Sequence, residues 1–227
     1  MAKAIVIVAH PDDETIWCGG TIMLHPNWKW TILSLCRKND GDRAPKFRAV
    51  CKKLGARCAM SDLEDDYPEK KLKELDEVDK RIRKMLKETK AGQEFDALFT
   101  HGRNGEYGHN RHKEVHRAVK RMLAQGELRS KKIFFFNYEK AKRGFYCVAR
   151  EDSARVTRLS AQIARAKHLL ITSSYQFSNG SFEERSASSV ESFRVNTHAI
   201  DGTLPVSSRV GRDKHSGRDA LPRVTEK

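Results

Sequence analysis

The sequence predicts a single α/β domain of the Rossmann-like, doubly wound type, with a mostly parallel central sheet. Short apolar runs rich in β-branched residues alternate with longer amphipathic stretches. Strands that alternate with helices indicate βαβ units, which build parallel sheets. A length of 227 residues suits one such domain. Several apolar runs are followed by polar loops, which is where ligands bind in folds of this kind.

The predicted strands are short apolar runs bounded by polar residues. The first, Ala4–Ala9, is continuously apolar, as is typical of a strand buried on both faces. Others are expected at residues 29–35, 57–61, 96–100 and 132–137, with a further one within 143–149.

The predicted helices show apolar residues at spacings of three and four. The clearest is Lys70–Thr89, where one face is leucine-rich. Pro45 and Gly55 mark the start and stop of another, and Asp152 or Ser153 is expected to cap the last. The expected helices span residues 14–24, 45–54, 70–89, 109–123 and 152–172.

The apolar pattern ends near residue 200. We therefore expect one domain over residues 1–200 and a basic, mobile tail over residues 201–227. No run of the roughly 20 apolar residues needed for a membrane span is present. The N-terminus lacks the apolar region of a signal peptide, so a cytoplasmic location is expected.

Charge and cysteine content narrow the function classes. The net charge is +14, which favours anionic partners. Much of this charge alternates in sign along helices, and no nucleic-acid-binding motif accompanies it, so nucleic acid is not an expected partner. The five cysteines are odd in number and lack Cys-x-x-Cys spacing, which argues against a disulfide framework. The sequence leaves the oligomeric state open, a homo-oligomer included.

Ionisable residues crowd the end of the first predicted strand. His10, Asp12 and Asp13 follow it directly, and Pro11 stiffens the turn. Such a cluster is costly to desolvate without a cation. Zinc accepts imidazole nitrogen and carboxylate oxygen, so one His and one Asp could supply two ligands and leave an Asp free for proton transfer. The alternative is a polar turn that caps the next helix.

A second cluster contains three histidines. His109, His112 and His116 lie at i, i+3 and i+7, on one face of a helix. That helix follows the strand at 96–100, so its N-terminus should reach the same edge of the sheet as His10. The alternative is a solvated helix surface.

Together the two clusters resemble the LmbE-like, PIG-L-type N-acetylglucosaminyl deacetylases. The stretch Ala9-His10-Pro11-Asp12-Asp13-Glu14 is similar to the first motif of this family. The stretch Gly105-Glu106-Tyr107-Gly108-His109-Asn110-Arg111-His112 is similar to its second, the His-x-x-His element. The resemblance covers roughly residues 3–195.

The resemblance implies a zinc-dependent deacetylase that releases acetate from an N-acetylglucosamine-containing molecule. His10, Asp13 and His112 would be the zinc ligands, although Fe²⁺ or another divalent ion could occupy such a site. Asp12 would be the general base. His109 would be the imidazolium that stabilises the oxyanion, and Tyr107 would contact the oxyanion or the substrate. Either His109 or protonated Asp12 would protonate the leaving amine.

Basic and amide side chains near these motifs are candidates for substrate binding. Arg37 and Arg43 follow the second predicted strand, and Arg103 and Asn104 precede His109. We expect them to contact sugar hydroxyls or a phosphate.

One departure from the family pattern concerns the residues between the two histidines. The family often has Pro-Asp there, and this chain has Asn110-Arg111. The expected acid is therefore absent, and Arg111 brings a cation that would favour an anionic substrate.

Two other functions remain compatible with the sequence. One is a metal-dependent amidase that acts on a non-sugar N-acyl substrate. The other is a non-catalytic basic protein that binds nucleic acid, with salt-sensitive affinity.

Overall fold

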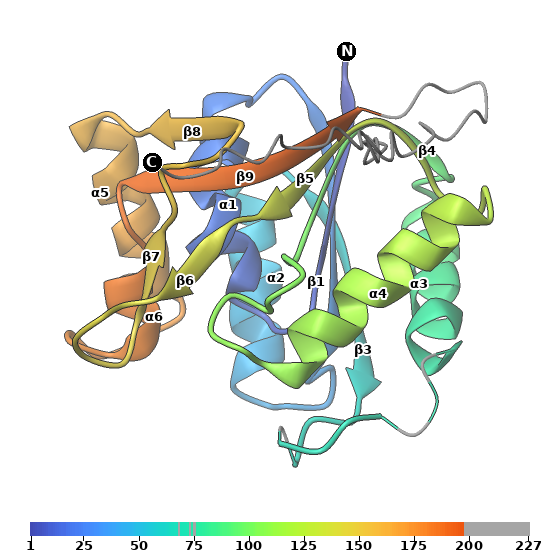
Figure 1. Cartoon of the computed structure of the whole chain (residues 1–227), viewed down its shortest axis with the longest axis horizontal. Coiled ribbons are helices and arrows are strands. Elements are labelled where there is room, and N and C mark those ends of the chain that lie inside the picture. The colour runs from blue at the N-terminus through green and yellow to red at the C-terminus, as the bar shows by residue number, and fades with distance from the viewer. Residues whose placement is uncertain (68, 73, 75, 198–227) are drawn as a thin grey trace, which may run out of the picture.

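The computed structural model describes residues 1–197, except residues 68, 73 and 75. Its centre is a seven-stranded sheet in the order β3-β2-β1-β4-β5-β9-β8 (Figure 1). The strands of this sheet are β1 (Lys3–Val8), β2 (Lys29–Cys36), β3 (Arg57–Leu63), β4 (Glu94–Thr100), β5 (Arg129–Phe136), β8 (Arg155–Arg158) and β9 (Val190–Thr197). A separate antiparallel ribbon pairs β6 (Tyr138–Lys140) with β7 (Cys147–Ala149).

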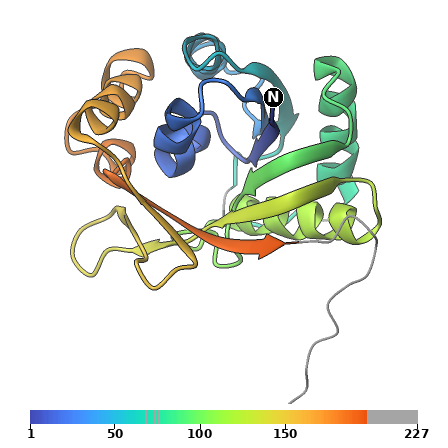
Figure 2. The same cartoon turned by 90° about the horizontal axis from the view of Figure 1, so that it is seen from above.

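Helices cover both faces of the sheet. Figure 2 shows α1 and α5 on one side of it and α3 and α4 on the other. The helices are α1 (Asp13–Leu24), α2 (Arg43–Lys53), α3 (Asp76–Thr89), α4 (Asn110–Ala124), α5 (Ala161–Leu169) and α6 (Phe182–Ser186), and a π-helical turn spans Leu170–Ser174.

Five strands run parallel, which confirms the predicted fold class. β1 pairs with β2 on one side and with β4 on the other, and β3 and β5 extend the sheet in parallel. Only the last two strands, β9 and β8, are antiparallel to their neighbours. From β1 the chain adds β2 and β3 on one side, and then β4 and β5 on the other. The loops after β1 and β4 therefore diverge around a crevice.

Side chains of β1 point alternately to the two faces of the sheet, so they pack into two separate layers of the core. Val6 and Val8 face α1 and α2, where they pack with residues such as Phe47. Ile5 and Ile7 face α3 and α4 instead. Because β1 is buried on both faces, its ends are fixed in position, and the loop that follows Val8 starts from a rigid base.

The helix predicted over residues 152–172 is wrong in its first part. The chain first forms β8, and α5 begins only after Ser160, whose side chain accepts a hydrogen bond from the backbone N–H of Ile163. β8 exists because it pairs with β9, a strand that the sequence pattern did not predict. This pairing depends on a partner more than thirty residues away, which local periodicity cannot reveal.

The helix predicted from Lys70 also begins later, at Asp76. Leu72, which lies before it in the chain, is tied to α4, because its N–H donates to Glu114 Oε1 at 2.8 Å.

Three further expectations concern the rest of the chain. All five cysteines are free thiols. Within the described residues, no helix combines the length and apolar character that crossing a bilayer requires. The expected boundary at residue 200 and the tail over 201–227 lie outside the described residues.

Candidate active site

The residues of the two sequence motifs meet at the crevice between β1 and β4. The loop after β1 carries His10, Asp12 and Asp13, while the loop after β4 and the start of α4 carry His109 and His112. The pocket between them has a volume of about 240 Å³. It is lined by His10, Pro11, Asp12, Asp13, Ile16, Arg37, Arg43, Asp65, Tyr107, His109, Phe182 and Glu183.

Three side-chain atoms form a small triangle beside this pocket. His10 Nδ1 lies 3.3 Å from Asp13 Oδ2 and 3.2 Å from His112 Nε2. The third side, from His112 Nε2 to Asp13 Oδ2, is 3.4 Å. A tetrahedral zinc ion with bonds of about 2.0–2.1 Å separates its ligand atoms by about 3.3 Å. The nitrogen and oxygen donors and their spacing therefore fit a zinc ion.

Asp13 is held so that one carboxylate oxygen faces the triangle. Its Oδ1 accepts a hydrogen bond from Trp17 Nε1 at 2.7 Å, and its Oδ2 accepts one from the His10 N–H at 2.8 Å. Trp17 is fully buried, so its indole orients this carboxylate from inside the core.

Each histidine of the triangle has a carboxylate on its other ring nitrogen. His10 Nε2 lies 3.0 Å from Asp65 Oδ2, and His112 Nδ1 lies 2.6 Å from Glu106 Oε2. Such contacts fix the tautomer of a ligating histidine and raise its basicity. These two carboxylates, together with Asp13, surround the triangle with negative charge that a divalent cation would offset.

Glu106 also binds a histidine that the sequence motifs did not single out. His101 Nδ1 lies 2.9 Å from Glu106 Oε2, and His101 Nε2 accepts the Ala9 N–H at 2.9 Å. Because its Nε2 is an acceptor here, the proton of a neutral His101 lies on Nδ1 and points to Glu106. His101 stacks on His112, with ring centroids 3.9 Å apart, and so supports the position of that ring.

Asp12 lies next to the triangle in a strained backbone conformation. Its φ of 125° is one that residues other than glycine rarely adopt. The turn is held by buried Glu14, whose Oε2 accepts the Asp12 N–H at 3.0 Å and whose Oε1 accepts the Tyr175 hydroxyl at 2.7 Å. Glu14 thus fixes the turn through two hydrogen bonds. Backbone strain of this kind often occurs at functional sites.

The Asp12 carboxylate points into the pocket and meets a cation. Arg43 Nη1 lies 3.1 Å from Asp12 Oδ2. Burial and the neighbouring Asp13 raise the pKa of Asp12 well above its usual range, while His10 and Arg43 act against this rise. A carboxylate with a raised pKa suits proton transfer near neutral pH.

His109 caps α4 and lies over the triangle. Its Nδ1 accepts the Arg111 N–H at 3.2 Å, so the ring proton lies on Nε2. Nitrogen atoms of His10, His109 and His112 all lie within 4.8 Å of one another. Burial and the two neighbouring histidines lower the pKa of His109 to about 3. The lowered pKa favours a neutral ring that donates through its N–H, whereas the resemblance implied an imidazolium.

Tyr107 belongs to an aromatic wall at the side of the pocket. Its ring centroid lies 4.7 Å from that of Phe182 and 5.5 Å from that of His109. Phe145, at the tip of the β6–β7 ribbon, extends the wall and is 61% exposed.

The four side chains expected to bind substrate separate into two pairs. Arg37 and Arg43 line the pocket, and Arg37 Nη2 lies 3.4 Å from Asp65 Oδ2. Arg103 and Asn104 line a different hollow on the other side of the loop after β4. The Asn104 side chain donates to the Tyr138 carbonyl at 2.7 Å and thus braces that loop. The structure therefore does not place Arg103 and Asn104 at the pocket.

Comparison with known proteins agrees with this geometry. Residues 5–123 match the profile of the family described as PIG-L: GlcNAc-PI de-N-acetylase, and they include both motifs. The chain belongs to this family.

One curated relative is an uncharacterized protein of Acanthamoeba polyphaga mimivirus. It is 25% identical over 132 residues, which cover 50% of this chain and 55% of that protein. The match thus spans about half the length of the relative.

Two solved structures share the fold at low sequence identity. The N,N'-diacetylchitobiose deacetylase of Pyrococcus horikoshii is 15% identical with a TM-score of 0.62, over 86% of this chain and 84% of that one. GalB, the 4-carboxy-2-hydroxymuconate hydratase of Pseudomonas putida, is 18% identical with a TM-score of 0.56, over 82% of this chain and 83% of that one. Because the second protein is a hydratase, the fold by itself does not determine the reaction.

The structure explains how this member of the PIG-L family accommodates Asn110-Arg111 in its second motif. Arg111 is fully buried, and its guanidinium binds the carboxylates of Glu64 and Glu114 and the carbonyl of Lys70. It therefore anchors the loop that carries Asp65 to His10. The expectation that Arg111 favours an anionic substrate is wrong, because Arg111 is fully buried and does not line the pocket.

The acid that appeared to be missing is supplied by Glu106. It stands in the same motif, three residues before His109. The loop reaches His112 because Gly105 has a φ of +66°, where a Cβ atom would come within 2.7 Å of the His109 carbonyl oxygen. His116 lies outside the site: its Nδ1 binds the His101 carbonyl oxygen at 2.9 Å, and the ring packs on Phe135.

Proposed function

We propose that the chain is a zinc-dependent deacetylase that hydrolyses the acetamide of an N-acetylglucosamine-containing small molecule or conjugate. The products would be acetate and the free amino sugar. The observation that carries this proposal is the triangle of His10, Asp13 and His112 with the Asp12 carboxylate beside it. A second, unligating carboxylate next to a metal site is what amide hydrolysis by water needs.

His10, Asp13 and His112 would hold the ion. A bound zinc ion would supply a Lewis acid that polarises the acetyl carbonyl and lowers the pKa of water. Fe²⁺ would satisfy the same donors, so the identity of the metal is part of the proposal.

Asp12 would act as the general base. Its carboxylate takes one proton from the attacking water as the new C–O bond forms at the acetyl carbon. The C–N bond then breaks, and the amine leaves with the proton that Asp12 returns. Arg43 orients this carboxylate through its contact with Oδ2.

His109 would stabilise the oxyanion. Its Nδ1 is committed to the Arg111 N–H, so Nε2–H is the donor that faces the pocket. A neutral donor of this kind stabilises developing negative charge, and it leaves the protonation of the amine to Asp12. Tyr107 lies beside His109 and would contact the same oxygen or the sugar.

The pocket offers both charge and apolar surface to a sugar. Arg37 and Arg43 would donate to hydroxyl groups, and the wall formed by Tyr107 and Phe182 would pack against the ring. The cytoplasmic location, the oligomeric state and an anionic group on the substrate stay predictions from the sequence.

The experiment that tests this function combines metal analysis with acetate release. The purified chain is loaded with Zn²⁺ or Fe²⁺ and offered N-acetylglucosamine, N,N'-diacetylchitobiose and an N-acetylglucosaminyl-inositol conjugate, together with N-acetyl amino acids. We expect one metal ion per chain and acetate release from the amino sugars.

Two results would favour the alternatives. Acetate release from N-acetyl amino acids alone would indicate an amidase with a non-sugar substrate. No acetate from any compound, together with salt-sensitive binding of DNA or RNA, would indicate a basic nucleic-acid-binding protein.

A further inference from the structure

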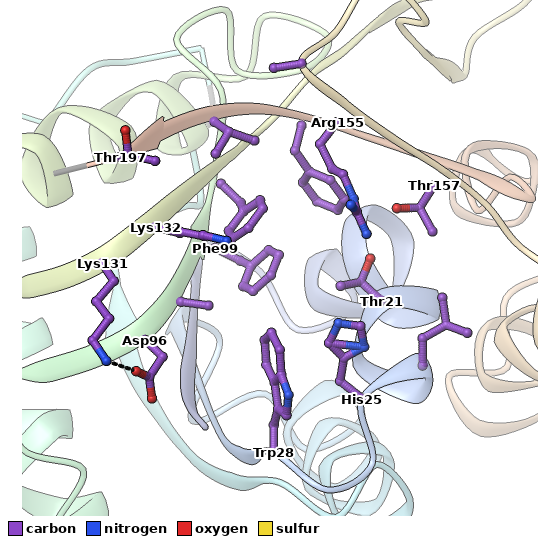
Figure 3. A pocket seen from close by; sticks show the side chains of 16 residues that line it. Thr21, His25, Trp28, Asp96, Phe99, Lys131, Lys132, Arg155, Thr157 and Thr197 are labelled. Carbon is purple, nitrogen blue, oxygen red and sulfur yellow. Dashed lines mark hydrogen bonds and ion pairs between the residues drawn. The ribbon is translucent and has the colours of Figure 1, made fainter. Parts of the chain in front are cut away.

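A second, larger hollow lies at the opposite edge of the sheet from the candidate active site. Its volume of about 650 Å³ falls within the range of small-molecule sites, which is about 300–1,000 Å³. The C-terminal end of α1 forms one wall, and β4, β5 and β9 form the floor (Figure 3). We call this hollow the amino-edge groove, because it lies where the parallel strands begin.

The amino-edge groove has an aromatic floor. The rings of Phe99 and Phe134 stack with centroids 4.5 Å apart and planes at 9°. Trp28 stands at the mouth of the groove, stacked on Trp30 at 5.5 Å and in edge contact with His25 at 4.2 Å. Trp28 and Phe134 are only partly buried, so flat apolar surface faces the hollow.

Two cations point into the groove from its walls. Figure 3 shows the ends of the Lys132 and Arg155 side chains directed into the hollow from opposite sides. Neither of them forms an ion pair with any residue that the structure describes. By contrast, Lys131 at the rim is paired with Asp96, with Nζ 2.6 Å from Oδ1. Asp96 is the only acid that lines the groove among the described residues.

The two cations of the amino-edge groove favour a negatively charged occupant. A second copy of this chain carries the same net charge of +14, which opposes docking on two cations. The segment 198–227 follows Thr197 at the rim, but it contains six Lys and Arg against four Asp and Glu. An anion is the partner that Lys132 and Arg155 lack, and the aromatic floor suits a flat apolar group.

We propose that the amino-edge groove is a binding site for a small anion that carries an aromatic ring. The ring lies against Phe134 and Trp28, and the anionic group lies between Lys132 and Arg155. The hydroxyl of Thr157 lines the same hollow and offers a further donor, whereas that of Thr21 already donates to Glu191. This site is separate from the catalytic pocket, so the proposal stands whichever reaction that pocket performs.

The test uses 8-anilinonaphthalene-1-sulfonate, an aromatic sulfonate whose fluorescence reports binding, with the full chain. We expect one probe per chain. The double variant K132Q/R155Q should bind the probe at least about tenfold more weakly, because charge-assisted contacts are lost. The matched control K131Q removes a rim cation that already has a partner, and it should change the affinity less than about twofold. A neutral probe, N-phenyl-1-naphthylamine, should bind weakly to all three proteins.

Several results would overturn the proposal. Equal affinity of the wild-type chain and K132Q/R155Q would show that these two cations do not bind the probe. An equal loss of affinity with K131Q would show an unspecific effect of charge. More than one probe per chain, unaffected by the variants, would show adventitious binding only. A dimer that excludes the probe, detected by light scattering, would show that a second copy fills the groove. Circular dichroism and melting temperature confirm that the variants are folded.

Discussion

The catalytic pocket and the amino-edge groove lie at opposite ends of the same parallel strands. Their charged groups differ in whether they have fixed partners. In the pocket, His10, His112 and Asp13 each have a second partner that fixes their orientation. In the groove, Lys132 and Arg155 point into the hollow, and neither forms an ion pair with a described residue.

These different partners suit the two hollows to different uses. Groups that transfer protons or bind a metal must be held close to one geometry before the substrate arrives. Cations without partners on a flat apolar surface select a ligand by charge and shape, and tolerate variation in its structure. If the fixed partners in the pocket are needed for its function, removing them should weaken zinc binding or turnover.

Among the groups that hold the proposed ligands in place, the largest expected effect comes from Glu106, the carboxylate shared by His101 and His112. The change E106Q removes its negative charge and one acceptor for a ring N–H. We expect the zinc affinity to fall about 10–100-fold, as for other carboxylates behind a ligating histidine. Competition with a chelator measures this affinity.

The matched control for that variant is E183Q, because Glu183 lines the pocket without contacting any of the three proposed ligands. It should retain the zinc affinity of the wild-type chain. An unchanged affinity in E106Q would mean that His112 needs no fixed partner, and the contrast between the two hollows would lose its basis.

A smaller effect should separate the two pairs of predicted substrate residues. In R43Q the Asp12 carboxylate loses its cationic partner, and kcat/KM should fall about tenfold or more. In R103Q it should change less than about twofold, because Arg103 lines another hollow. Acetate release with both variants measures the difference. A larger loss in R103Q would mean that substrate extends beyond the pocket, around the loop after β4.

The sequence predicted the parts of this molecule that depend on short segments. The run from Ala4 to Ala9 indicated a buried strand, and His10, Asp12 and Asp13 follow it directly. Because carboxyl ends of parallel strands meet at one edge, the same reasoning brought His112 to His10. These groups do lie together in the structure, while their roles in catalysis stay predictions.

The sequence did not reveal contacts between distant segments. Asp65 comes to His10 through a loop that Arg111 anchors, and no local pattern indicates this. Glu106 was visible within the second motif, but its function depends on a turn with two positive φ angles, at Gly105 and at Glu106 itself. Likewise, β8 was mistaken for helix because the strand that it pairs with, β9, is remote in sequence.

The most direct test of the account is a comparison of D12N with H112A, because it separates proton transfer from metal binding. We expect D12N to keep one zinc ion per chain and to lose about 10²–10⁴-fold in kcat, since it retains the three ligands but not the base. We expect H112A to lose the zinc ion and the activity together. If D12N lost its zinc in parallel with its activity, or if H112A stayed fully metallated and active, the assignment of roles would be wrong.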